Sequence, residues 1–200
     1  MDAAQWDARY AESERVWSAG PNQFVERALA DLPPGRAVDL AAGEGRNAVW
    51  LASRGWDVTA VDFSRVALAR GRETAPDASV TWVCADVLGW QPGPEPFDLA
   101  VLAYLQLVES ERRRAVLTAF GCLRPGGTFF LVAHDSSNLT EGTGGPQDPS
   151  VLMTADDVLA DLGDASYDVV EATRVARPVP APEGIDHTAY DALVRVVRTA

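Results

Sequence analysis

Short apolar runs alternate along this chain with stretches in which apolar residues recur every three or four positions. The runs are typical of buried strands, and the longer period is typical of amphipathic helices. The pattern predicts strands over residues 36–41, 57–62, 79–84, 97–103, 128–134, 167–176 and 190–198. It predicts helices over residues 3–14, 22–32, 45–54, 65–74, 109–120 and 155–162. Such alternation across short loops indicates an α/β fold with a mainly parallel sheet and helices on both faces.

Polar and turn-forming residues mark where these elements begin and end. Ser64 and Thr154 stand directly before two expected helices, where a side-chain oxygen can accept from the first free N–H groups. The Pro-Gly-Gly sequence at 125–127 predicts a sharp turn that leads into the fifth strand. Residues 177–184 carry three prolines and predict an irregular stretch.

Composition narrows the class of protein. With 200 residues, 47% of them hydrophobic, the chain predicts one domain with a sizeable core. The net charge is −12, which disfavours nucleic acid and anionic membranes as partners. All 17 basic residues are Arg, so Schiff-base chemistry on a lysine is excluded. The heavy use of Ala and Arg suggests a bacterial source with a GC-rich genome.

Targeting and thiol signals are weak. No apolar run approaches the roughly 20 residues of a membrane-spanning helix, and the first residues lack the pattern of a signal peptide. We therefore expect a cytoplasmic protein. Cys84 and Cys122 lie among apolar neighbours, and we expect both to be buried and inert. No set of residues has the spacing of a metal site, so no metal is expected.

Glycine and aspartate follow the first three expected strands. Gly43 and Gly45 lie between the first strand and a helix, whose free N–H groups favour negative charge. Asp62 follows 19 positions after Gly43, a spacing typical of a carboxylate that accepts from ribose hydroxyls. Asp86 and Val87 follow the third strand and have the groups to bind an adenine. A plain tight turn, a solvated Asp62 and a turn-capping Asp86 are the structural alternatives.

Taken together, these motifs resemble the class I S-adenosylmethionine-dependent methyltransferases. The resemblance rests on DLAAGEG at 39–45, Asp62, CAD at 84–86 and LRPGG at 123–127. It implies a Rossmann-like sheet of seven strands in the order 3-2-1-4-5-7-6, the last antiparallel. GEGRN at 43–47 and the N-terminal residues Trp6, Tyr10, Trp17 and Asn22 most resemble the small tellurite-resistance/thiopurine-type branch. That branch implies a helical lid over residues 1–34 and a core over 35–200.

The same resemblance assigns roles to residues around S-adenosylmethionine. Asp39 and the turn at 43–45 hold the methionine part, Arg46 lies near its carboxylate, and Asp62 takes the ribose. Asp86 and Val87 bind the adenine, while Phe63 either lies against the purine or packs in the core. Ala41 stands where many members have the first glycine, and its small side chain should fit. We expect Asp62→Ala to remove cofactor binding and leave the fold intact.

Candidates for the acceptor site lie at later strand ends. His134 is the expected general base, because histidine titrates near neutrality; a structural histidine is the alternative. Tyr104 and Gln106 follow the fourth strand, where the acceptor usually faces the methyl group in this family. His187 lies near the last two strands with Tyr190 and Asp191. Trp17 and Asn22 are expected to shape the lid, and Trp17 could equally pack in the core.

These features predict methyl transfer to a small, aromatic or heterocyclic acceptor through O, N or S. Two apparently inert cysteines argue against arsenite as acceptor. The alternatives are a protein that binds the cofactor without catalysis and an NAD-dependent oxidoreductase, though the chain has no Tyr-x-x-x-Lys pair. The oligomeric state is left open between monomer and homodimer.

Overall fold

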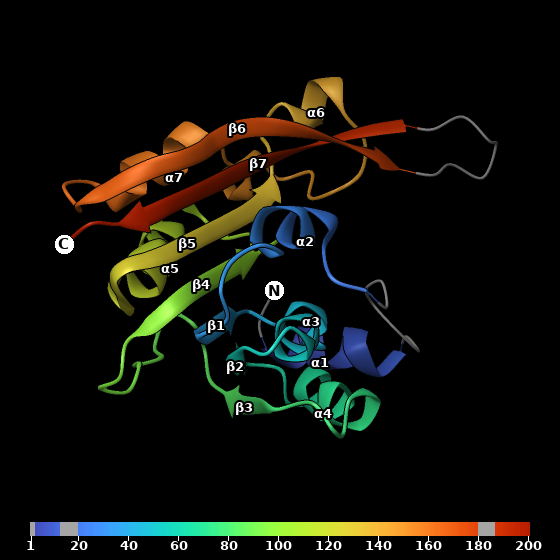
Figure 1. The fold of residues 1–200 in the computed structure, drawn as a ribbon. Coiled ribbons are helices and arrows are strands. Elements are labelled where there is room, and N and C mark those ends of the chain that lie inside the picture. Colours follow the sequence, from blue (N-terminus) through green and yellow to red (C-terminus); the bar gives the residue numbers. More distant parts are fainter. Residues whose placement is uncertain (1–2, 13–19, 180–186) are drawn as a thin grey trace.

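A single seven-stranded sheet organises the computed structural model, which describes residues 3–12, 20–179 and 187–200. Its order, β3-β2-β1-β4-β5-β7-β6, is the predicted one, and β7 runs antiparallel to both neighbours (Figure 1). The strands are β1 (Arg36–Leu40), β2 (Asp57–Asp62), β3 (Val80–Cys84), β4 (Phe97–Ala103), β5 (Leu123–His134), β6 (Tyr167–Val179) and β7 (His187–Arg198).

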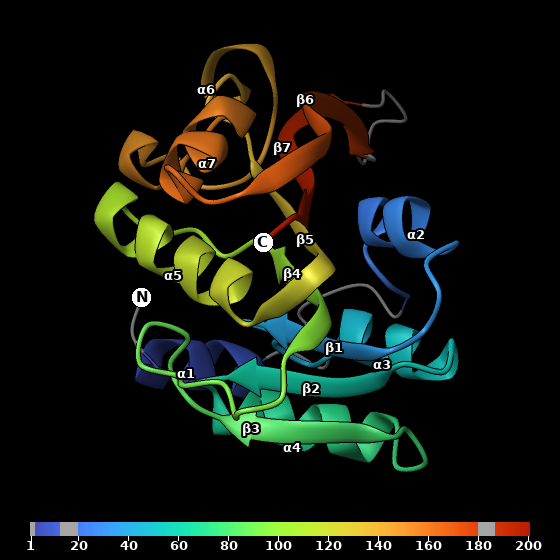
Figure 2. The same ribbon diagram turned by 60° about the vertical axis from the view of Figure 1, so that its left-hand side comes forward.

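Helices cover both faces of this sheet (Figure 2). They are α1 (Ala3–Glu12), α2 (Gln23–Leu29), α3 (Arg46–Ser53), α4 (Arg65–Thr74), α5 (Glu109–Gly121), α6 (Asn138–Glu141) and α7 (Ala155–Leu162), with a 3₁₀ turn, η1, at Pro149–Val151. Alternate residues of a strand point to opposite faces. Leu99 and Val101 of β4 therefore pack with α2 and α3, whereas Ala100 and Leu102 pack with α5 and α7. No helix in the described residues is long and apolar enough to cross a membrane.

Two predicted helix caps are confirmed. The Ser64 hydroxyl accepts from the Ala67 N–H at 3.1 Å. Thr154 and Asp157 form a reciprocal capping box at the start of α7. On the face of the sheet that α5 and α7 cover, a buried ion pair joins these two helices. Arg112 Nε lies 2.6 Å from Asp161 Oδ2.

Three expectations need correction. The Pro-Gly-Gly sequence lies inside β5, where a register shift against β4 absorbs the extra residues and Gly126 takes a φ of +83°. The prolines near residue 177 do not stop β6, which as an edge strand tolerates missing donors and continues to Val179. Cys84 is exposed, because it ends the other edge strand, whereas Cys122 is buried and burial raises its pKa to about 12.

Candidate functional site

The carboxyl ends of β1, β2, β4 and β5 meet at one edge of the sheet. In the register, Leu40 pairs with Val61 on one side and with Leu102 on the other, and Ala103 pairs with Val132. His134, the last residue of β5, faces Asp191 of the antiparallel β7. Ligands of open α/β sheets bind at this edge, because the connections leave it uncovered. The predicted strand-end residues are therefore brought into one region.

Asp39 is the most buried acid on the β1 side of this edge. Its Oδ2 accepts from the Ala48 N–H of α3 at 3.1 Å. Its Oδ1 is buried and has no hydrogen-bond partner in the described part of the chain. Burial raises the pKa of Asp39 to about 7, although the Ala48 bond and the charge of Arg46 act in the opposite direction. A buried oxygen without a donor is suited to a polar or cationic group of a ligand.

The turn after β1 is tightly built. Ala41 and Gly45 take φ values of +57° and +75°, and the Ala42 N–H donates to the Val61 carbonyl at 3.1 Å. A Cβ added at Gly45 would lie 2.3 Å from the ring of Trp82. The missing side chain at Gly45 thus makes room for Trp82 of β3, and the role of this turn toward the cofactor stays a prediction.

Asp62 holds this turn from β2. Its Oδ2 accepts from the Gly43 N–H at 2.8 Å and its Oδ1 from the Ser64 N–H at 2.7 Å. Burial raises its pKa, and these two bonds partly offset that effect. Each carboxylate oxygen has two lone pairs, so both can accept further bonds. Asp62 is therefore a brace for the glycine turn as well as a candidate ligand group.

The N-terminal helix reaches the same place. Asp7 of α1 accepts from the Ser64 hydroxyl and from the Val66 N–H at the start of α4. Its neighbour Tyr10 is buried and lies against Trp6, with ring centroids 5.6 Å apart. This places α1 over the carboxyl end of β2, where the predicted ribose site lies.

The third strand end follows the turn-capping alternative. Asp86 is exposed, and its Oδ1 accepts from the Leu88 N–H at 2.9 Å. Val87 is buried, and Phe63 is half-buried. Their roles toward adenine stay predictions.

A second cluster surrounds Asp191, which has no exposed surface. Its Oδ2 accepts from Tyr104 Oη and from Arg177 Nε, each at 2.9 Å. Its Oδ1 lies 3.3 Å from His134 Nδ1. Burial alone would raise the pKa of Asp191, but the neighbouring side chains of His134, Arg177 and Tyr104 outweigh burial and lower it. The carboxylate is therefore ionised at neutral pH.

Tyr104 is held under strain at the centre of this cluster. Its φ is +60°, which is uncommon for a bulky residue and is concentrated at functional sites. Its ring lies 4.9 Å from the imidazole of His134, between centroids. Burial raises the pKa of Tyr104 to about 12, and the charge of Asp191 adds to the effect. The phenol is thus a neutral donor, not a base.

Arg46, the first residue of α3, joins the two clusters. Burial lowers its pKa, while Tyr104, Asp39 and Tyr10 raise it and Arg177 lowers it further. Groups of both clusters thus influence the pKa of one guanidinium. The strand register independently places both clusters at the same edge of the sheet.

The loop after β5 covers His134. A Cβ added at Gly145 would lie 3.0 Å from the imidazole ring. Asn138 fixes this loop, because its Nδ2 donates to the carbonyls of Thr143 and Gly144 while its Oδ1 accepts from the Tyr190 N–H. The side chain of His134 keeps 16% of its surface exposed. Access to its free edge is therefore narrow.

Of the remaining predicted residues, Gln106 and Asn22 have partners of their own, and Asn22 also lies beside Tyr104, whose pKa its side chain lowers against the effect of burial. Gln106 Nε2 donates to the Val151 carbonyl at 3.2 Å. Asn22 caps α2 and donates its N–H to Asn47 Oδ1 at 2.9 Å, which ties the N-terminal segment to α3. His187 is exposed and precedes Asp191 by four residues, or about 13 Å along β7. Trp17 lies outside the described residues.

Sequence reasoning missed Arg177, because it falls at the start of the proline-rich stretch. A usable signal for Asp191 was its place among buried positions of an apolar strand, between Ala189 and Leu193. A charged side chain at such a position must have partners.

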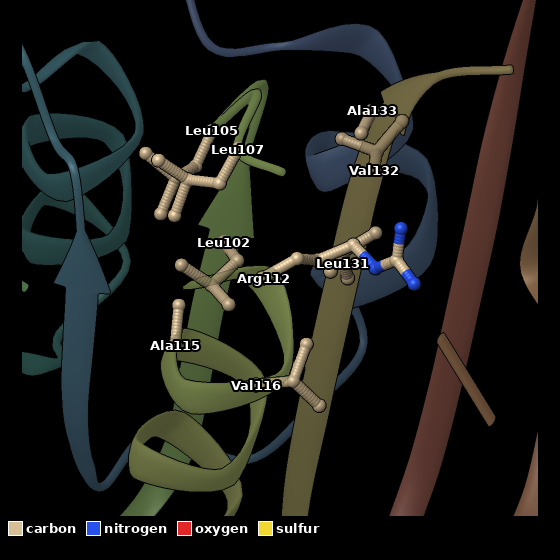
Figure 3. Close-up of a pocket in the computed structure, with 9 residues that line it drawn as sticks. All are labelled: Leu102, Leu105, Leu107, Arg112, Ala115, Val116, Leu131, Val132 and Ala133. Atoms are coloured by element: carbon tan, nitrogen blue, oxygen red, sulfur yellow. The ribbon is translucent and has the colours of Figure 1, made fainter. Parts of the chain in front are cut away.

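An apolar cavity elsewhere is not part of this site. It lies between β4, β5 and α5 and measures about 10 Å³ (Figure 3). Its lining includes Leu102, Leu105, Ala115 and Leu131. A void of that size holds at most one water molecule, so it is a packing defect.

Known proteins resemble this chain in sequence and fold. The sequence pattern of a family described as "Methyltransferase domain" matches residues 37–127. Thiocyanate methyltransferase 1 of Arabidopsis thaliana is 30% identical over 180 residues, which cover 86% of this chain and 78% of that protein. Three bacterial demethylmenaquinone methyltransferases match more briefly, and the chain spans only 52–56% of their length.

Two solved structures share the fold. TehB from Haemophilus influenzae superposes with a TM-score of 0.75 at 16% identity and covers 97% of this chain and 67% of that one. The N-methyltransferase NodS from Bradyrhizobium japonicum, in complex with S-adenosyl-L-homocysteine, superposes with a TM-score of 0.74 at 19% identity. Both chains are covered completely.

Proposed function

This chain belongs to the class I S-adenosylmethionine-dependent methyltransferases, and on that premise we propose that it methylates a small acceptor held between Tyr104 and His134. The acceptor we propose is aromatic or heterocyclic and reacts through O, N or S. The observation that carries the proposal is the shared sheet edge, where the strand register brings the buried Asp39 and the Asp191 cluster to the same end of the parallel strands.

The residues on the β1 side fit the cofactor. Asp39 Oδ1 is buried without a partner and is suited to the cationic amino group of the methionine part. Arg46 carries the charge for its carboxylate, and Asp62 has lone pairs left for the ribose hydroxyls. Asp86 and Val87 complete the proposed site at adenine. The docking of Asp7 on Ser64 supports a lid function for the N-terminal segment.

S-adenosylmethionine supplies a methyl group already activated by its sulfonium, so the transfer is an in-line displacement. The protein must hold the acceptor atom about 3 Å from that methyl group and exclude water. Tyr104 provides an aromatic wall, and the loop around Gly145 limits the entry of water. His134 takes the acceptor's proton where the acceptor has one to lose.

The relatives support a small acceptor. Their names specify thiocyanate, demethylmenaquinone and trans-aconitate, which are all small molecules of different chemistry. The net charge of −12 supports the same proposal, because it disfavours a nucleic acid. The aromatic residues beside the site favour a flat molecule.

A screen with methyl-labelled S-adenosylmethionine tests the proposal. The panel contains phenols, thiols, quinols and N-heterocycles, and the Asp39→Asn variant gives the background. We expect label transfer to at least one class and titration heat with S-adenosyl-L-homocysteine. Heat without transfer to any acceptor would favour a binding protein without catalysis. Absence of both would overturn the proposed site.

A further inference from the structure

We propose that Asp191 is a positioning residue that fixes the tautomer of His134, leaving Nε2 as the base that faces the acceptor. The inference rests on the proposed function and deepens it. It makes the acceptor a molecule with an ionisable O–H, N–H or S–H group, since a base is needed only where a proton must leave.

The two oxygens of Asp191 have different partners. Oδ2 accepts both from Tyr104 and from Arg177, each at 2.9 Å. Oδ1 receives neither and lies 3.3 Å from His134 Nδ1. Oδ1 and Nδ1 are both buried, and neither makes a hydrogen bond within the described part of the chain. They are thus left to each other.

Electrostatics select one tautomer. Asp191 is ionised and has no exposed surface. A neutral imidazole has one N–H and one lone pair. A lone pair on Nδ1 would face the carboxylate without a proton between them, so the proton belongs on Nδ1. Nε2 then carries the lone pair.

The groups around His134 come from three neighbouring strands. The neutral Tyr104 directly follows β4 and lies against the imidazole, Asp191 of β7 lies 3.3 Å from Nδ1, and Arg177 of β6 binds Asp191. The loop side presents the backbone of Gly145, which carries no charge. Within this arrangement, Asp191 Oδ1 is the acceptor oxygen that lies 3.3 Å from His134 Nδ1, and the guanidinium of Arg177 has no acceptor to offer.

The step balances as a displacement. The acceptor atom bonds to the methyl carbon, and sulfur keeps the electron pair of the broken C–S bond. The proton of the acceptor passes to His134 Nε2, which gives an imidazolium beside Asp191. Solvent takes the proton after product leaves.

Asp191→Asn tests this with little change in shape. Tyr104 and Arg177 donate to the Oδ2 position, so the amide oxygen is expected there. The amide NH₂ then occupies the Oδ1 position and donates to His134 Nδ1. The proton of the neutral imidazole moves to Nε2, where it blocks the base. The same exchange in a serine protease triad lowers kcat by about 10⁴.

Nitrogen NMR reads the tautomer directly. The chain has two histidines, so ¹⁵N-histidine labelling gives two imidazoles, and the exposed His187 is the internal reference. At a pH where the shifts are constant, we expect a protonated Nδ1 on His134 in the wild type. In Asp191→Asn we expect a protonated Nε2. A wild-type His134 protonated on Nε2 would overturn the proposal without any variant.

Tyr104→Phe removes one hydrogen bond to Asp191 and leaves the charge of Asp191 in place. Arg177 still donates to Oδ2 in that variant, so the Nδ1–H tautomer should remain. Asp161→Asn is the matched control, because it makes the same substitution in another buried Asp–Arg pair. It should leave the tautomer unchanged. A change of the His134 tautomer in Asp161→Asn would show that the NMR signal reports a general loosening of the structure.

Kinetics complete the test with whichever acceptor the screen identifies. Asp191→Asn should lower kcat by about 100-fold or more and leave the Kd for S-adenosyl-L-homocysteine within about threefold. At assay temperatures below its melting temperature, Asp161→Asn should have the wild-type kcat. An unchanged kcat in Asp191→Asn would overturn the positioning role while methyl transfer stood. Absence of transfer by the wild type would instead count against the proposed function, whatever the NMR result.

Discussion

The two halves of the sheet edge are built by different means. On the β1–β2 side, backbone N–H groups hold the carboxylates over sequence separations of 2, 9 and 19 residues. On the β4–β7 side, side chains hold one another, and Tyr104 and Asp191 are 87 positions apart in the sequence. The first half depends on chain geometry, and the second depends on side-chain identity.

This difference matters for specificity. A carboxylate fixed by backbone donors keeps its place when neighbouring side chains change. A cluster of Tyr104, His134, Arg177 and Asp191 is altered by a single substitution. We infer that the cofactor half is shared among acceptor specificities, and that acceptor preference changes in the cluster half.

The largest expected effect lies in the cluster half. His134→Ala should lower kcat for an acceptor with an ionisable proton by about 10²- to 10⁴-fold, because it removes the general base. The Kd for S-adenosyl-L-homocysteine should stay nearly constant, since His134 lies on the other half. Steady-state kinetics and titration calorimetry measure the two quantities.

His187→Ala is the paired variant, since His187 is exposed and lies about 13 Å along β7 from Asp191. It should retain the wild-type kcat. A similar loss of kcat in both variants would show that the start of β7 also belongs to the site and that the two histidines do not differ in role.

The next effect lies in the cofactor half. The sequence alone suggests that Asp62→Ala spares the fold, but the structure shows Asp62 bracing Gly43 and Ser64. Losing it leaves two N–H groups without partners, so the free energy of unfolding should fall by about 2–5 kcal/mol. Affinity for S-adenosyl-L-homocysteine should fall by about 100-fold or more. Urea unfolding and calorimetry measure both losses.

Asp57→Ala controls for position in the strand, because Asp57 begins β2 and its side chain is 70% exposed. It should change neither quantity appreciably. Full stability in Asp62→Ala would show that the turn does not need its brace.

Asp39→Asn should raise stability while it lowers binding. Burial raises the pKa of Asp39 from 3.8 to about 7. Its contribution to stability is therefore present in full below about pH 4 and is lost as the pH rises to about 7. At pH 8 the variant should be more stable than the wild type by about 1–4 kcal/mol. Unfolding measured from pH 4 to 8 should show a flatter profile for the variant.

Asp98→Asn is the opposite control. The bonds from Arg36 and Arg124 outweigh the effect of burial and lower the pKa of Asp98. Its contribution is present above the unfolded pKa and is lost in acid, so its removal should destabilise the protein at pH 8. Destabilisation of the Asp39 variant at pH 8 would mean that the buried carboxylate is already paired.

The sequence predicted local features well. The helix caps at Ser64 and Thr154 follow from residues close together along the chain, whereas the strand order follows from the family resemblance. The errors fell where distant residues decide the outcome. The Pro-Gly-Gly sequence lies inside β5, where a register shift against β4 accommodates it, and the exposure of Cys84 depends on β3 being an edge strand.

The cluster half was harder to foresee for the same reason. Arg177 meets Asp191 because β6 and β7 form one long hairpin, and the prolines in that region suggested an irregular chain. Tyr104 meets Asp191 through a backbone strain that no residue type predicts. Such contacts need the register of three strands, which a hydrophobic pattern does not contain.

The smallest effect concerns Ala41, which takes a φ of +57° in the glycine turn. Ala41→Gly relieves a left-handed strain of about 1 kcal/mol and adds chain entropy of about 0.5–1 kcal/mol to the unfolded state. We expect a gain of less than about 1 kcal/mol in the free energy of unfolding and unchanged cofactor affinity. Ala42→Gly, at an adjacent buried residue without positive φ, should lose about 1 kcal/mol. Equal losses in both variants would show that the turn carries no strain and that its carboxylate brace alone sets its shape.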